Sequence, residues 1–307
     1  MSISLIVWVI IGIVILLWFV LKKKKGNQRD YSLGLKIAED IQAFIKNKTY
    51  SEAEALIEKA DVNDITQVVD HLALSLKEED IVAWKKSSNS DFSKISLGVF
   101  YIHLAWISRS HQLAKDVSES SAESFHKYLL LCDGEFSELS ESSIFQSEMY
   151  SRMIRLQMSL NDTSLATDYF TQVTEASPDL IWPYIHYAEM IQPKWGAELQ
   201  ELEVFYESLP ANFLIKSIVE LKLILDSIGC DDNYFKKYNG NIKAFAAEKI
   251  KLIDTESQNA DLSSIHRYIL FNYMWALSDS IGNKPLLKKY AKLVGGNFTI
   301  YPFGLAQ

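Results

Sequence analysis

Histidines are the side chains of this 307-residue chain that are best suited to bind a metal or transfer a proton. None of them follows another histidine or a cysteine by three or four residues, the spacing at which one helix face presents two ligands to a metal. Two of the histidines are eight residues apart and would share a face only in a continuous helix. The pattern therefore predicts no metal site and no cofactor. The six histidines are His71, His103, His111, His126, His186 and His266.

The other patterns that could carry chemistry are equally sparse. Glu189 follows His186 by three residues, and we favour a surface pair on a helix over an acid–base pair. The sequence lacks glycine-rich phosphate loops, the Gly-x-Ser-x-Gly elbow, the His-Glu-x-x-His helix and Cys-x-x-Cys. We expect a protein that is not an enzyme and has no catalytic residue. A deep pocket in which carboxylates and a histidine converge would argue for an enzyme.

Aromatic residues gather in one short stretch, together with a lysine. Trp182, Tyr184, Tyr187, Lys194 and Trp195 are the candidate partner-binding residues. Aromatic side chains bury much area at little cost in rotamer entropy, which suits a binding surface. The same residues would also fill the core between packed helices, and this is the interpretation we favour. Both alternatives remain open at this point.

The charge of the chain favours some partners over others. All 39 acidic residues follow Lys25, whereas four of the 31 basic residues are Lys22–Lys25, so residues 26–307 carry a net charge of −12. This balance argues against nucleic acid and favours a basic protein partner. Cys132 and Cys230 are the only cysteines, so a disulfide framework is not expected.

The spacing of apolar residues predicts an all-α fold. Apolar residues recur with helical period along most of the chain, and sustained alternation is absent before an extended tail at 297–303. Serine- and acid-rich stretches at 118–124 and 137–143 each suit a loop or a capped helix start, and Asp133-Gly134 suits a helix end. We place a boundary there, between an N-terminal helical subdomain, 26–143, and a helical-repeat subdomain, 144–307. The predicted helices span 33–45, 49–60, 64–76, 97–107, 144–160, 164–176, 180–191, 198–209, 212–228, 234–254, 263–281 and 285–294.

The first 25 residues have the composition of a membrane anchor. Residues 3–21 carry no charge, and a helix of that length is about 28 Å long, close to the thickness of a bilayer core. The lysines Lys22, Lys23, Lys24 and Lys25 follow directly and would hold this end on the cytoplasmic side. The pattern predicts a single-pass protein of a bacterial inner membrane, with an outward N-terminus, bilayer contact through residues 3–21 and a cytoplasmic body.

The second half of the chain resembles the tetratricopeptide repeat family. Phe170 with Pro178 and Phe205 with Pro210 mark the ends of two second-of-pair helices, and the prolines are 32 residues apart. The resemblance implies a solenoid of stacked helical hairpins over residues 144–303. The turn Pro193-Lys194-Trp195-Gly196 also resembles a Pro-Lys/Arg-Trp-Gly turn of an uncharacterised bacterial all-helical family, which implies no activity.

Two hypotheses for function follow. The first is a membrane-anchored, cytoplasm-facing adaptor whose helical repeat binds another protein. The alternative is an immunity protein that binds and neutralises a secreted antibacterial toxin, in which the acidic surface would cover a basic site.

Overall fold

The computed structural model describes residues 29–109, 116–141, 143–228 and 241–303. These residues are helical almost throughout, and within them the structure has a single isolated bridge and no strand. The all-α prediction is confirmed. The helices are α2 (Lys36–Lys46), α3 (Tyr50–Ile57), α4 (Val62–Ser75), α5 (Glu78–Ser88), α6 (Asp91–Arg109), α7 (Glu119–Ser137), α8 (Gln146–Leu160), α9 (Thr163–Ala176), α10 (Ile181–Met190), α11 (Leu199–Ser208), α12 (Phe213–Ser227), α13 (Ile242–Ser257), α14 (Ser264–Ser280), α15 (Lys284–Val294) and α16 (Ile300–Phe303), with the short 3₁₀ helix η2 (Pro193–Trp195) before α11.

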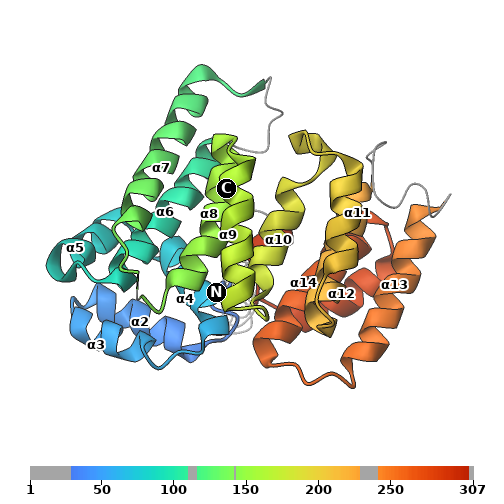
Figure 1. Cartoon of the computed structure of the whole chain (residues 1–307). Coiled ribbons are helices and arrows are strands. Elements are labelled where there is room, and N and C mark those ends of the chain that lie inside the picture. Colours follow the sequence, from blue (N-terminus) through green and yellow to red (C-terminus); the bar gives the residue numbers. More distant parts are fainter. Residues whose placement is uncertain (1–28, 110–115, 142, 229–240, 304–307) are drawn as a thin grey trace, which may run out of the picture.

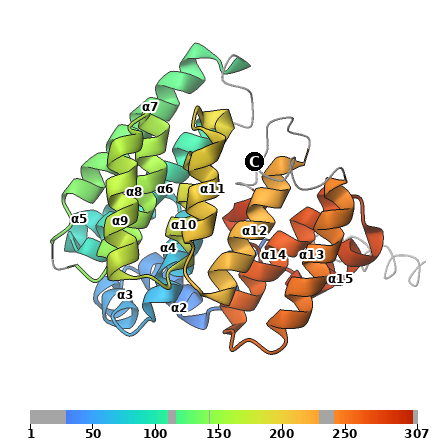
Figure 2. The same ribbon diagram turned by 45° about the vertical axis from the view of Figure 1, so that its right-hand side comes forward.

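The even-numbered helices form one continuous row. Each of α2, α4, α6, α8, α10 and α12 contacts the next even-numbered helix, so the row reaches α14. The odd-numbered helices α3, α7, α9 and α15 pack on the helix that precedes each in the chain. The colours of Figure 1 accordingly run from blue and green on one side of the molecule to orange and red on the other, and Figure 2 shows α12 and α14 side by side. This order is compatible with a helical repeat.

Polar side chains begin many of these helices by accepting a hydrogen bond from the first turn. Ser118 accepts from the backbone N–H of Ser121, so the stretch 118–124 is a capped helix start. In the stretch 137–143, Ser137 is instead the last residue of α7, and residue 142 lies outside the described residues. The side chains that cap other helices in this way are Asp61, Asp162, Asn212, Asn241, Ser263 and Asn283.

The buried apolar side chains fall into two clusters. One is built mainly from α2 to α7, and the other mainly from α9 to α15. Helix α8 contributes to both, because Met153 and Leu156 point into the first cluster and Ile154 into the second. The predicted boundary at 143 lies just before this shared helix.

The described body has no membrane-spanning helix. None of the helices in residues 29–109, 116–141, 143–228 and 241–303 is both long and apolar enough to cross a bilayer. The longest, α6 and α7, have 19 residues each but carry charged residues such as Lys94 and Glu135 along their length. The prediction of a single-pass protein of a bacterial inner membrane is therefore corrected. The segment 3–21 and Lys22–Lys25, on which it was based, lie outside the described residues.

The two ends of the described chain meet. The backbone N–H of Asp30 donates to the carbonyl of Gly296 at 2.7 Å, and the N–H of Phe298 donates to the carbonyl of Asp30 at 2.9 Å. The tail that was predicted to be extended then turns into the short α16, although Tyr301 keeps an extended conformation (φ −97°, ψ 139°). Helix α16 packs on α14 and brings Tyr301 toward the centre of the molecule.

Candidate functional site

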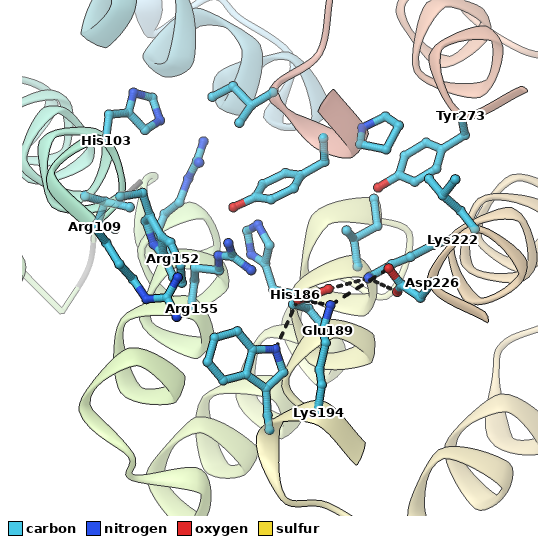
Figure 3. Close-up of a pocket in the computed structure, with 18 of the residues that line it drawn as sticks. His103, Arg109, Arg152, Arg155, His186, Glu189, Lys194, Lys222, Asp226 and Tyr273 are labelled. Carbon is cyan, nitrogen blue, oxygen red and sulfur yellow. Dashed lines mark hydrogen bonds and ion pairs between the residues drawn. The ribbon is translucent and has the colours of Figure 1, made fainter. Parts of the chain in front are cut away.

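The row of even-numbered helices lines a cavity of about 520 Å³, here called the inner cavity. Helices α6, α8, α10, α12 and α14 each contribute side chains to it, and η2 and α16 complete the wall. Figure 3 shows that charged side chains from several of these helices point toward one another across it. The charged residues of the wall are Arg109, Arg152, Arg155, Lys194 and Lys222, with Glu189 and Asp226 as the acidic ones.

Arg152 is held in a buried network between α8 and α4. Its Nη2 donates to Asp70 Oδ1 at 2.7 Å, and its Nε donates to Glu148 Oε1 at 2.7 Å. Thr66 donates a further short hydrogen bond to Glu148. Burial alone would raise the pKa of Asp70, but the charge of Arg152 and the contact with His103 hold it below its ordinary value. Arg152 is thus a compensated charge that joins two helices of the row.

A second cluster of charges joins α10, α12 and η2. Lys222 Nζ lies 2.5 Å from Glu189 Oε2 and 2.6 Å from Asp226 Oδ2. Lys194 Nζ lies 2.8 Å from Glu189 Oε1, to which Trp195 Nε1 also donates at 3.1 Å. Burial opposes ionisation of Glu189, yet Lys222, Lys194 and Arg155 hold its pKa well below the usual range. Glu189 is therefore ionised, and both acids of the cavity wall are paired with lysines.

Arg155 makes no ion pair within the described chain and acts on Glu189 only from a longer distance. It lies three residues after Arg152 on α8 and is only 9% exposed. In the described chain its guanidinium has no carboxylate within ion-pairing distance, and its buried Nε has no hydrogen-bond partner. Its contacts are aromatic, because Cζ lies 4.4 Å from the ring centre of Trp106 and 4.9 Å from that of Tyr301.

His186 lies beside Arg155 in the wall (Figure 3) and is 1% exposed. Its Nδ1 is 2.8 Å from the backbone carbonyl oxygen of Ser151. Its Nε2 is buried and makes no hydrogen bond within the described chain. Burial, together with the charges of Arg152 and Arg155, lowers the pKa of His186 to about 3. The imidazole is therefore neutral at physiological pH.

The five residues proposed from sequence do not form one surface. Trp182 and Tyr184 are 3% and 5% exposed and belong to the apolar core. Tyr187 stacks on Phe170 with ring centres 4.1 Å apart, away from the inner cavity. Lys194 and Trp195 do line the cavity, and Trp195 is 37% exposed. The core interpretation thus holds for Trp182 and Tyr184, and a binding role for Lys194 and Trp195 stays a prediction.

The turn that holds Lys194 and Trp195 has a local cause. Pro193 begins η2, and Gly196 ends it at a φ of +94°, a left-handed conformation that favours glycine. The N–H of Gly196 donates to the carbonyl of Pro193 at 3.0 Å, which closes the turn. The Pro-Lys-Trp-Gly turn noted in the sequence therefore presents a lysine and a tryptophan to the cavity.

Sequence reasoning missed most residues of the site. Arg152 and Arg155 lie within the buried run 151–158, whose apolar members pack into the core, and Lys222 lies within the apolar run of α12. These residues could have been found from the sequence, because a charged residue inside an apolar helical stripe is unusual. Tyr301 gave no such signal, because its place depends on how the tail folds back. In the described part of the chain, no three His, Cys, Asp or Glu side chains come together as a metal site would require.

Comparison with known proteins gives no relative from which a role could be transferred. No family model, no curated protein and no solved structure matches this chain.

Proposed function

We propose that this protein binds a ligand through an anionic group, which the inner cavity holds against Arg155. The observation that carries the proposal is Arg155, which is 9% exposed, has a buried Nε and has no carboxylate partner in the described chain. A buried charge without a partner is costly, and proteins ordinarily pair it. An anionic ligand would supply the missing partner in a place that solvent reaches only through the cavity.

The charge balance around the cavity supports a single negative charge on the bound group, because the five basic residues of the wall, Arg109 included, face two acids in the wall and two carboxylates behind it. Lys194 and Lys222 are balanced by Glu189 and Asp226. Arg152 is more than balanced by two carboxylates behind the wall. A volume of about 520 Å³ also falls within the range of small-molecule sites.

Binding accounts for the site better than catalysis does. Carboxylates and a histidine do converge in the cavity, which is the arrangement that would argue for an enzyme. Glu189 is bound to two lysines, however, so it is not poised to take up or release a proton near neutral pH. A histidine with a pKa of about 3 is a weak base and suits a fixed hydrogen-bond acceptor.

Binding of a protein partner is the second candidate, and one observation favours it. Trp195 is 37% exposed at the cavity, and the Cζ atom of Arg109 lies 5.8 Å from its ring centre. Exposed tryptophan and arginine are typical of protein-binding hot spots. An adaptor would then hold an acidic group of its partner at Arg155. No contact of the described residues favours the toxin-inhibitor hypothesis over the adaptor.

Calorimetric titration tests the proposal with simple probes. We expect the full chain to bind phenylacetate or inorganic phosphate, and to bind neutral phenylacetamide more weakly. Arg155→Met should weaken binding of the anion about 30-fold or more, the equivalent of about 2 kcal/mol, because a desolvated charge pair is lost.

Lys216→Met is the matched control, because it removes a positive charge from an exposed position of α12 outside the cavity. It should leave the affinity unchanged. Equal binding of the anion and of phenylacetamide, an unchanged affinity in Arg155→Met, or no binding of either anion would overturn the proposed function.

A further inference from the structure

Besides Arg155, three residues that line the inner cavity have buried polar atoms with no hydrogen-bond partner in the described chain: His103, Trp106 and His186. Of these, His186 lies beside Arg155. Nε2 of His186 is buried and makes no hydrogen bond in the part of the chain that the structure describes. Buried polar atoms are nearly always hydrogen-bonded, so each exception calls for an explanation. His186 lines the same cavity as Arg155 and comes from the neighbouring helix α10.

The hydrogen bond of Nδ1 determines whether Nε2 of His186 is a donor or an acceptor. Nδ1 lies 2.8 Å from the carbonyl oxygen of Ser151, which can only accept a hydrogen bond. Nδ1 must therefore carry the proton, and in the neutral ring Nε2 has a lone pair and no hydrogen. The low pKa of about 3 keeps the ring neutral over the physiological range. Nε2 can thus accept a hydrogen bond and cannot donate one.

Arg155 and His186 are neighbours in space as well as along the wall. Both contact the ring of Tyr301, whose centre lies 4.9 Å from Arg155 Cζ and 5.7 Å from the centre of the imidazole. The positive charge of Arg155 also contributes to the low pKa of His186. The cavity therefore places hydrogen-bond donors with a positive charge next to a neutral acceptor.

A ligand that matches both Arg155 and His186 Nε2 has an anionic group and, beside it, a hydrogen-bond donor. We propose that the ligand is a carboxylate with an O–H or N–H group on its α-carbon, bound with its carboxylate on Arg155 and its donor on His186 Nε2. This inference rests on the proposed function and narrows it to one chemical class. Two sources supply that chemistry: small 2-hydroxy or N-acylamino acids, and the C-terminal residue of a polypeptide.

A matched pair of probes tests the preference on the unaltered full chain. Phenylacetate and mandelate differ only by a hydroxyl on the α-carbon, and each enantiomer of mandelate is titrated separately. We expect one enantiomer to bind about tenfold more tightly than phenylacetate, as one added hydrogen bond to a buried acceptor allows. Equal affinities would overturn the inference.

Two variants assign the preference to His186. His186→Phe keeps a planar ring but has no acceptor, so the ratio of the two affinities should fall to about one. His186→Gln can place an oxygen near the position of Nε2 and should retain part of the ratio. An unchanged ratio in both variants would overturn the role of His186, while Lys216→Met should keep the ratio of the wild type.

Nuclear magnetic resonance gives a readout that needs no variant. We expect the ¹⁵N resonance of His186 Nε2 to shift when mandelate is added and to stay in place with phenylacetate at equal saturation. A donor bound to the lone pair changes that resonance, whereas a merely structural histidine would respond alike to both probes. Identical shifts with both probes would overturn the inference.

Peptide probes separate the two sources. N-acetylphenylalanine and a tetrapeptide that ends in phenylalanine share the carboxylate and the α-N–H. Tighter binding of the tetrapeptide supports a polypeptide C-terminus, and tighter or equal binding of the single residue supports a small molecule. Tetrapeptide amide, which lacks the carboxylate, should not bind, and its binding as tightly as the acid would overturn the inference.

The inference and the proposed function fail in different ways. If phosphate and phenylacetate bind through Arg155 but neither mandelate nor N-acetylphenylalanine binds more tightly than phenylacetate, only the inference fails. If no anion binds, or if Arg155→Met binds anions as the wild type does, both fail.

Discussion

Arg152 and Arg155 lie three residues apart on α8, yet their surroundings differ completely. Arg152 has two carboxylates at 2.7 Å and is 4% exposed. Arg155 has two aromatic rings within 5 Å and no carboxylate partner in the described chain. The surroundings of Arg152 stabilise the fold, whereas those of Arg155 leave its charge to interact with a bound ligand.

The two arginines should therefore differ in what they contribute to stability. Arg152→Met leaves Asp70 and Glu148 buried without a cation, and we expect it to lower the free energy of unfolding by about 3–5 kcal/mol. Arg155→Met loses contacts with Trp106 and Tyr301 but also removes an unpaired buried charge. We expect a change of at most about 1–2 kcal/mol from these opposing effects. Urea denaturation of both variants measures the difference.

The contrast between the two variants is the informative quantity. Lys216→Met should match the wild type, since Lys216 is exposed. A cost for Arg155→Met as large as that for Arg152→Met would mean that Arg155 is a structural residue, which would contradict its role in binding.

The difference between these arginines could not be predicted from the sequence. Both occupy the same helical stripe, and local spacing offers each of them Glu148 as a neighbour on α8, at i−4 for one and i−7 for the other. Which one is neutralised depends on Asp70, which α4 supplies from 82 residues away. Whether Arg155 has a carboxylate partner depends on the tertiary structure, so no sequence motif predicts it.

At the scale of the elements, apolar periodicity predicted most helices to within a few residues. The predicted helix 144–160 is α8 (Gln146–Leu160), and the predicted helix 164–176 is α9 (Thr163–Ala176). The end predicted at Asp133-Gly134 was wrong, because α7 continues to Ser137. Leu129, Cys132 and Phe136 form a buried stripe across that point, and its packing on α6 outweighs the preference of glycine for a helix end.

The contact between α6 and α7 depends on one glycine. A Cβ atom at Gly98 would overlap the ring of Phe136, which is 2% exposed and has little room to move. We expect Gly98→Ala to lower the free energy of unfolding by about 1–3 kcal/mol, despite the gain in helix propensity, because the helices must separate. Thermal or urea unfolding measures it.

Gly134 provides a control on the partner helix. Nothing lies within 4 Å of a Cβ built there, so Gly134→Ala should stabilise the protein by about 0.5–1 kcal/mol. In the double variant Gly98→Ala with Phe136→Leu, the smaller side chain should recover part of the loss. Equal effects of the two glycine substitutions would show that the close approach does not matter.

At the scale of the whole molecule, the sum of the charges and their distribution carry different information. Residues 26–307 have a net charge of −12, which predicts a basic partner, and that remains a prediction. The wall of the inner cavity, by contrast, has five basic residues and two acidic ones among its described residues. Composition could not show this, because the basic residues come from α6, α8, α12 and η2 and meet only after the row of helices has assembled.

Burial of several histidines makes the stability of the molecule sensitive to acid. Burial is the first cause that lowers the pKa of His71, His103, His186 and His266. In the unfolded chain these histidines bind protons near pH 6.5, whereas in the folded chain they bind them only at lower pH. The stability therefore falls as the pH drops below about 6.5. With a pKa of about 3, His186 alone should account for a loss of about 2 kcal/mol between pH 7 and pH 5.

Unfolding in urea at pH 7 and pH 5 measures this loss. His186→Gln does not titrate in this range, so the fall in stability should be smaller by about that amount. The stability of Lys216→Met, at an exposed position of α12, is the control and should fall as that of the wild type does. The same pH dependence in His186→Gln and the wild type would contradict a neutral buried imidazole.

The pairing of Asp30 with Gly296 and Phe298 has a consequence for how the fold is encoded. The segment that follows α15 is hydrogen-bonded to residues that precede α2, so these two points of the described chain are neighbours. A short peptide could join these neighbouring points at small entropic cost, and new ends could then be opened in an exposed connection elsewhere. The cyclic order of the helical pairs, more than the place where synthesis begins, would then specify this architecture.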